Sequence, residues 1–348
     1  MNTRTGSDTG LKSSPLRPQA SFTVDAESDI FPVLANYAST LTPGYREWGV
    51  VTVTVQNPSS APLCRRIAVE IPGWSDQEIQ MADVAAGKVE QYRFAPTLQP
   101  HALANRNMEK ATIVITATDG AGRTEFTHSA ALRIHSIEDM YWGHDSSFAR
   151  FLASWVTPHD SQVEALLVRA RVLVPGGKLP GYESDKNTAS QARSTIVQVQ
   201  AIYRALQQAG LNPAKNPRSA STLIGNLPEH VQLPHDSLQN LSASYIDGAV
   251  LYASLFENIG LQSQVLLAPG HAYVGVRLSE DFDDYLYLET AFPAQADFDK
   301  AVESAQHGLN HYRESIVSVQ IPDARQDGIV PLSSPQKSGV PVEISGLR

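Results

Sequence analysis

The chain has 348 residues, of which 42% are hydrophobic and 18% charged, and its formal net charge is −9. This composition predicts folded cores and a length sufficient for two domains of ordinary size. It argues against a protein that binds nucleic acid or an anionic membrane, because no basic run is available to neutralise phosphates. The single cysteine, Cys64, excludes an intramolecular disulfide framework and a thiolate-rich metal site.

Residues 1–20 are rich in Ser, Thr, Gly and Pro, and they are predicted to form a disordered lead. They lack the apolar central region of a secretory signal. No apolar run in the chain approaches the roughly 18 residues that suggest a transmembrane helix. We therefore expect a cytoplasmic protein that does not bind a membrane.

Alternating apolar and polar residues over 21–136 predict an all-β domain. The expected strands are residues 50–56, 67–71, 89–94, 111–118 and 124–134. The last two flank Asp119-Gly120, a dipeptide that favours a hairpin. Several short strands separated by turns are typical of a sandwich of roughly immunoglobulin type. Because helices follow the strands along the chain, we expect two separate domains.

The first domain contains no evident catalytic constellation, because its histidines are scattered. Cys64 is followed by Arg65 and Arg66, and neighbouring arginines can lower the pKa of a thiol. No histidine motif accompanies it, so an ordinary structural or surface thiol is the favoured interpretation. We predict an accessory or binding role for this domain.

Residues 137–322 are predicted to form an α+β domain that begins with helices. The expected helices lie at residues 147–155, 161–173 and 189–209, before a loop-rich stretch at 211–240. The pairs His144-Asp145 and His159-Asp160 suggest a metal site, but each aspartate also stands where it would cap a helix. Capping is the favoured interpretation, and no metal or cofactor is predicted.

A buried helix over residues 242–260 is the central element of this domain. Its residues are apolar on nearly every face, which is typical of a helix that passes through a core. Ser242 and Ser244 are candidate N-caps, and Asp247 would lie in the first turn, where the helix dipole favours a carboxylate. Gly260 is expected to end the helix.

Strands are predicted after this helix, because short apolar runs alternate with turn residues. The expected elements are strands at 264–268, 271–276, 285–290 and 316–321 and a helix at 296–307. Residues 323–348, rich in Pro, Ser and Gly, are predicted to be a flexible tail.

The second domain resembles the transglutaminase-like, papain-like family. Bacterial members carry a pattern similar to C-I-D-G-x-x-L-[FY]-A-x-x-L-E-x-I-G-L, followed by G-H-A-[FY]-V-G and L-E-T. This chain has YIDGAVLYASLFENIGL at residues 245–261, GHAYVG at 270–275 and LET at 288–290. The resemblance covers about 50 residues closely and implies an active-site helix followed by two strands. At the position of the family's nucleophilic cysteine this chain has Tyr245.

The resemblance implies that His271 and Glu289 are the histidine and the acidic residue of a catalytic site. Cysteine catalysis requires a thiolate, a histidine that keeps it ionised and a group that orients the histidine. A phenol, with an ordinary pKa of about 10, is a poor nucleophile at neutral pH. Ser244 is adjacent, but one step along a helix turns a side chain by about 100°, so it would not point where the cysteine pointed.

Two classes of function remain open. The first is a catalytically inactive transglutaminase-like protein, a pseudoenzyme, that binds protein or peptide. The second is a degenerate peptidase or acyltransferase that uses His271 and Glu289 with a non-cysteine nucleophile such as Ser244, or with a nucleophile supplied by a partner. The sequence names neither the partner nor the oligomeric state.

Overall fold

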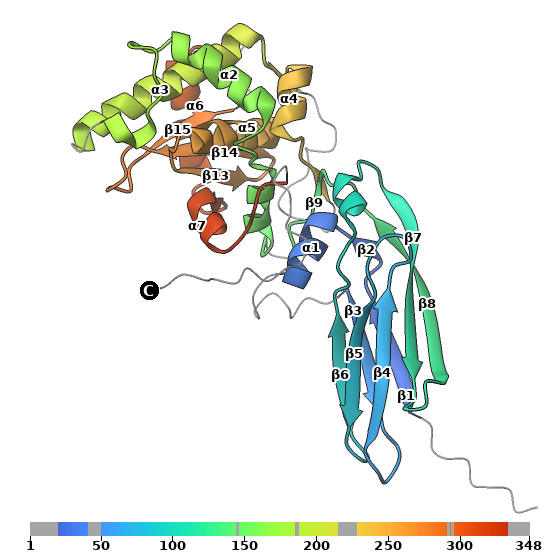
Figure 1. Cartoon of the computed structure of the whole chain (residues 1–348). Helices are drawn as coiled ribbons and strands as arrows, with labels where there is room; N and C mark the ends of the chain where they lie inside the picture. Colours follow the sequence, from blue (N-terminus) through green and yellow to red (C-terminus); the bar gives the residue numbers. More distant parts are fainter. Residues whose placement is uncertain are drawn as a thin grey trace, which may run out of the picture. The chain divides into compact units, whose positions relative to one another are not determined.

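The computed structural model describes residues 20–40, 50–143, 146–184, 188–214, 228–290, 293 and 296–332. The chain divides into two compact units, each assembled from three separate stretches (Figure 1). The first unit comprises Met1–Asp29, Pro43–Gln99 and Lys110–Arg133. The second comprises Ile30–Thr42, Pro100–Glu109 and Ile134–Arg348. Together they make a mixed protein of helices and several β-sheets.

The first unit is built on two sheets, which Figure 1 shows as long, roughly aligned arrows. One sheet has the strand order β1-β3-β6, with strands Ser21–Ala26, Val51–Gln56 and Val89–Phe94. The other has the order β2-β8-β7-β4-β5, with strands Asp29–Ile30, Thr124–Ile134, Glu109–Thr118, Leu63–Glu70 and Glu78–Val84. Strand β3 is antiparallel to β1 and β6, and β4 is antiparallel to β5 and β7.

The predicted alternation is confirmed in strand β3. In β3, Val51, Val53 and Val55 are fully buried, while the residues between them are partly exposed. One-sided burial is what a period of two residues produces when a strand covers an apolar interior. The predicted hairpin is also present, and the Asp119 carboxylate accepts hydrogen bonds from the backbone N–H groups of Ala121 and Arg123, each at 2.9 Å.

Residues 30–42 and 100–109 lie in the second unit, whereas the sequence placed them in an all-β first domain. They include helix α1 (Pro32–Thr40) and the 3₁₀ helix η1 (Pro100–Ala104). The helix is held by contacts that are remote in sequence. The Tyr37 hydroxyl lies 3.1 Å from Ser154 Oγ and donates to the Val330 carbonyl at 3.0 Å.

The second unit contains a four-stranded sheet of order β15-β14-β13-β16, in which every neighbouring pair is antiparallel. The strands are Tyr285–Glu289, His271–Arg277, Ser263–Ala268 and Val317–Gln320. Helix α5 (Tyr245–Asn258) packs against β13 and β14, and helix α6 (Phe298–His311) packs against β15. The predicted order of a buried helix followed by strands is therefore observed, and Gly260, at φ 79°, follows the end of the helix as expected.

Further helices surround this sheet and α5. They are η2 (Ala149–Trp155), α2 (Ser161–Val172), η3 (Gly181–Ser184), α3 (Thr188–Ala209), α4 (Pro234–Asn240) and α7 (Ile321–Gln326). Two short ladders complete the unit: β9 (Asp139–Met140) with β11 (Glu229–His230), and β10 (Asn212–Pro213) with β12 (Ser242–Ala243). No helix among the described residues is both long enough and apolar enough to cross a bilayer.

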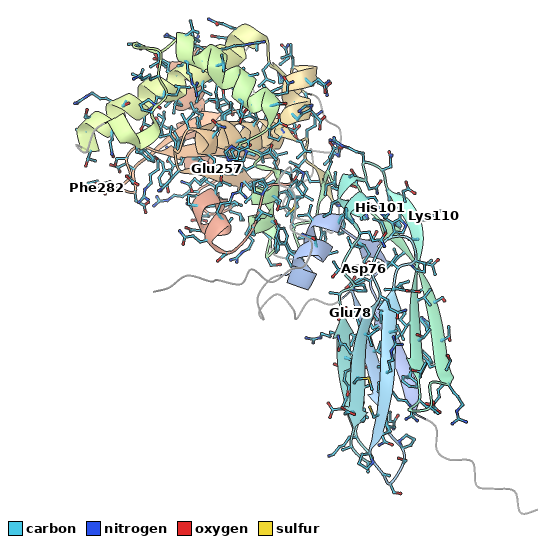
Figure 2. The ribbon with its side chains drawn as sticks, in the orientation of Figure 1. Asp76, Glu78, His101, Lys110, Glu257 and Phe282 are labelled. Atoms are coloured by element: carbon cyan, nitrogen blue, oxygen red, sulfur yellow. The ribbon has the colours of Figure 1, made fainter. Side chains whose placement is uncertain are left out.

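The α7 helix crosses the predicted start of the tail at residue 323, and an ion pair connects it to α5. Arg325 donates to both carboxylate oxygens of Glu257, at 2.8 and 2.9 Å, and Figure 2 labels Glu257. Arg325 also donates to the carbonyl oxygens of Ala153, Val156 and Ile329. A guanidinium with this many acceptors fixes the segment up to residue 329 against the core.

Candidate functional site

The N-terminus of α5 is fixed by a capping box. The Ser244 hydroxyl accepts from the Asp247 backbone N–H at 3.4 Å, and the Asp247 carboxylate accepts from the Ser244 N–H at 2.9 Å. The other oxygen of Asp247 accepts from the Gln232 N–H at 2.7 Å. These bonds satisfy otherwise free backbone donors and attach the preceding segment to the start of the helix.

Asp247 has a structural role, as the sequence indicated. Burial raises the pKa of its carboxyl group, and the hydrogen bonds from Ser244 and Gln232 oppose that rise. The side chain is almost completely buried. Its oxygens are occupied by backbone donors, so Asp247 holds the geometry of the helix start.

A close approach between α5 and the end of β15 places Tyr245 at the site. A Cβ atom at Gly248 would lie 2.9 Å from both Cβ and the carbonyl oxygen of Thr290, so a larger residue does not fit there. The Thr290 hydroxyl donates to the Tyr245 carbonyl at 2.7 Å. The glycine in the Tyr-Ile-Asp-Gly sequence is therefore required by packing, not by backbone conformation.

His271 and Glu289 come together as predicted. Nε2 of His271 lies 2.7 Å from Oε2 of Glu289, and Oε1 of Glu289 accepts from the Thr290 N–H at 2.9 Å. The ladder pairs Glu289 with Tyr273, and residues two apart share a face of a sheet, so His271 and Glu289 lie on the same face. Glu289 is 3% exposed, so this pair forms away from bulk water.

Two tyrosine rings contact the imidazole of His271. The ring centroid of Tyr245 lies 3.9 Å from that of His271, with a 55° angle between the planes. The ring of Tyr273 lies 4.5 Å away in an edge-on arrangement. Tyr245 is 37% exposed, whereas Tyr273 is 4% exposed. Tyr245 therefore forms the solvent-facing wall of the site.

The contact of Tyr273 with the imidazole was not predicted, since the sequence indicated only a core aromatic residue. Its hydroxyl lies against Gly308 of α6, where any Cβ atom would overlap the phenol. Burial, and then the charge of Glu289, raises the pKa of Tyr273 to about 12. Tyr273 is thus a neutral phenol at physiological pH, and the only sequence signal for its role was its spacing of two residues from His271.

The arrangement provides a histidine and an orienting carboxylate without an evident nucleophile. The Ser244 hydroxyl accepts from the Asp247 N–H, and no hydrogen bond joins Ser244 to His271 among the described residues. A serine whose hydroxyl is engaged in a helix cap, without a hydrogen bond to a histidine, is not activated as a nucleophile. The site can polarise a ligand group through His271 and offer it the ring of Tyr245.

The remaining candidates lie elsewhere. Asp160 caps α2 by accepting from the Gln162 N–H at 2.8 Å, which supports the capping interpretation. His144-Asp145 lies outside the described residues. No group of three or more His, Cys, Asp or Glu side chains suited to a metal occurs in the part of the chain that the structure describes.

Cys64 is exposed, and a hydrogen bond with Asp83 raises its pKa, so the neighbouring arginines do not activate it.

Comparisons with known proteins add little to this geometry. No protein-family model and no curated protein matches the chain. A crystal structure of a FixG-related protein from Vibrio parahaemolyticus is similar over 34% of this chain and 95% of its own length. Its sequence identity is 18% and its TM-score is 0.22, and a likeness this low carries no argument about fold or function.

Proposed function

We propose that the second unit is a transglutaminase-like domain without a catalytic nucleophile that binds protein or peptide. The observation that carries this proposal is the position of Tyr245, whose ring lies 3.9 Å from the ring of His271. The helix, His271 strand and Glu289 strand follow one another as in the family pattern. Together they form a histidine–carboxylate pair that faces a phenol where the family has a thiol.

An exposed aromatic ring beside a polarising histidine favours binding. Tyrosine contributes a large, rigid contact area and a hydroxyl, which is why it is enriched in binding surfaces. The first unit, which we propose to be an immunoglobulin-like sandwich, would supply a second contact surface for the same partner. Its paired sheets and buried alternating side chains support that assignment.

The degenerate-enzyme alternative has less support. It requires Ser244, or a nucleophile from a partner, to reach His271. Ser244 is 3% exposed and engaged in the capping box, so its hydroxyl would have to leave the helix cap to act. That loss costs about 0.5–2 kcal/mol of helix stability before any chemistry begins.

The proposed arrangement of helix, His271 and Glu289 is tested by replacing Tyr245 with cysteine. In a Cys64→Ser background, Tyr245→Cys should react with iodoacetamide faster than Cys64 does in the wild type, because a histidine and a helix N-terminus stabilise a thiolate. Adding His271→Ala should slow the reaction with iodoacetamide to the rate of an ordinary thiol. An ordinary, slow thiol would contradict the assignment, and so would peptide hydrolysis by the wild type that His271→Ala abolishes.

Binding is tested separately, with random peptides displayed on phage and selected on the wild-type chain. Peptides that depend on the site should lose affinity for Tyr245→Arg. Phe282→Arg is the matched control, because Phe282 is 55% exposed and lies at the outer margin of its unit in Figure 2. If no selected peptide distinguishes Tyr245→Arg from Phe282→Arg, this site is not the binding surface.

A further inference from the structure

A cluster of ionisable side chains surrounds the two-strand ladder of β9 and β11. The ladder pairs Asp139 with His230 and Met140 with Glu229, and the Val231 N–H donates to the Glu138 carbonyl at 2.7 Å. We call residues 138–140 and 229–232 the clasp. The charged and titratable groups that face it are Arg106, His135, Asp236 and Asp247.

His230 is the cationic centre of the clasp. Its Nδ1 lies 3.6 Å from an oxygen of Asp139, and its Nε2 lies 3.8 Å from an oxygen of Glu138. Asp139 also contacts His135 Nδ1 at 3.3 Å. Asp139 first, and Glu138 in addition, raise the pKa of His230, although partial burial opposes the rise. The clasp therefore favours the protonated imidazole.

Arg106 is the second cation of the cluster. It contacts Glu138 and Asp236, each at 2.6 Å. Arginine remains charged at every pH at which the protein is folded, so it cannot compensate for the loss of a proton from His230. Burial raises the pKa of Glu138 even though Arg106 and His230 lower it.

Glu229 is a largely buried carboxyl group in the partner strand. Oε2 of Glu229 accepts a hydrogen bond from the Trp142 indole at 3.1 Å. Burial raises the pKa of Glu229 to about 7, and the charge of Asp247 adds to the rise. The hydrogen bond from Trp142 opposes this rise, so Glu229 in the closed clasp is mainly neutral below pH 7 and mainly ionised above it.

The clasp is joined to the start of α5 by a short path. His230 precedes Val231 and Gln232, and the Gln232 N–H donates to Asp247 at 2.7 Å. Asp247 belongs to the capping box that immediately precedes Tyr245. If the clasp opens, strand β11 separates from β9, and the segment that brings the Gln232 N–H to Asp247 is released.

We propose that the clasp is a pH-sensitive latch, closed in mildly acidic solution and loosened in alkaline solution, that controls how firmly the start of α5 is held. In the closed state His230 is charged beside Glu138 and Asp139, while Glu229 is neutral beside Trp142. In alkaline solution both protons leave. Arg106, which contacts Glu138 and Asp236, then remains as the cation of a cluster that also holds the carboxyl groups of Asp139, Glu229 and Asp247.

Proton linkage gives the direction in which the stability of the closed clasp changes with pH. Glu229, His230 and Glu138 all have raised pKa values in the closed clasp, so the closed state binds more protons than the open one. Stability from each group is complete below its ordinary pKa and is lost as the pH rises through the raised value. Asp139 has a lowered pKa and acts in the opposite direction, but its effect is confined to strongly acidic solution. This proposal is independent of what the site beside Tyr245 binds.

Hydrogen exchange of the Val231 and Gln232 amides tests the proposal in the full chain. After correction for intrinsic exchange rates, protection should fall about tenfold between pH 6 and pH 8 from Glu229 alone, given its shift to about 7. Glu229→Gln should abolish most of this fall, whereas Glu164→Gln, at an exposed carboxylate of α2, should leave it unchanged.

Two results of the hydrogen-exchange measurement would overturn the proposal. Protection that is constant with pH in the wild type, or an unchanged fall in Glu229→Gln, rules out the latch. If Glu229→Gln does not fold, the indole N–H resonance of Trp142 in the wild type provides the second measurement. That resonance should shift with a midpoint near pH 7 as Glu229 ionises, and a resonance that does not titrate contradicts the proposal.

Discussion

Gly248 and Thr290 pack so closely that the helix bearing Tyr245 lies directly on the end of the strand bearing Glu289. We predict that Gly248→Ala destabilises the second unit by about 1–3 kcal/mol, because the added methyl group overlaps Thr290 backbone and side-chain atoms. Chemical denaturation measures the loss. Gly120→Ala is the control, since nothing lies within 4 Å of a Cβ atom there. Equal effects of the two substitutions would contradict the close approach.

Gly308→Ala should also destabilise the protein, although alanine is intrinsically the better helix residue by about 1 kcal/mol. The methyl group would overlap the hydroxyl of Tyr273 and approach its Cζ atom to 2.7 Å. Removing the hydroxyl with Tyr273→Phe should therefore recover part of the loss. A double-mutant cycle measures this coupling, and strictly additive effects would argue against the contact.

His271→Ala should cost about 3–5 kcal/mol, because it removes the imidazole that pairs with the buried carboxylate of Glu289. Neutralising that carboxylate in the double variant His271→Ala/Glu289→Gln should restore part of the stability. Thermal unfolding of both variants at one pH provides the comparison. If the double variant is the less stable of the two, the buried pair is not the source of the cost.

Asp247→Asn should destabilise α5 more than Ser244→Ala does. An amide group retains one acceptor oxygen, so one of the N–H donors of Gln232 and Ser244 is left unsatisfied in a buried place, at a cost of about 1–3 kcal/mol. Loss of the Ser244 cap alone costs about 1 kcal/mol. Urea denaturation of the two variants tests the order, and the reverse order would mean that Asp247 does not hold the Gln232 segment.

The sequence predicted the local elements around the candidate site because the signals for them are local. Ser244 and Gly260 delimit α5, and the short apolar run that follows the turn at Gly270 indicates a strand. No short pattern specifies the register that pairs Tyr273 with Glu289, and the approach of His271 to Glu289 was expected only from the family resemblance and the alternation around Glu289. The contact of Tyr273 with His271 lies within one strand, and it was missed because an apolar strand gives an aromatic residue the simpler interpretation of a core side chain.

Long-range contacts explain the other differences. Helix α1 was not predicted because Tyr37 is held by Ser154 and Val330, which lie 117 and 293 positions away. The Arg325 contacts extend ordered structure beyond residue 322 for the same reason. The clasp was not predicted either, since His135, Glu138 and His230 come together only through a two-residue ladder. Patterns over ten or twenty residues contain no information about such partners.

The interleaving of the two units constrains the order in which the protein can fold during synthesis. The stretch Ile30–Thr42 leaves the ribosome before the first unit is complete, yet its partners Ser154 and Val330 are made much later. At about 5–20 residues per second, the apolar residues of α1 wait many seconds for Val330 to be made. During that interval Tyr37 lacks the Ser154 and Val330 partners that hold it in the folded protein. Folding of the second unit is therefore completed after translation has passed residue 330, whereas the sheets of the first unit can form earlier.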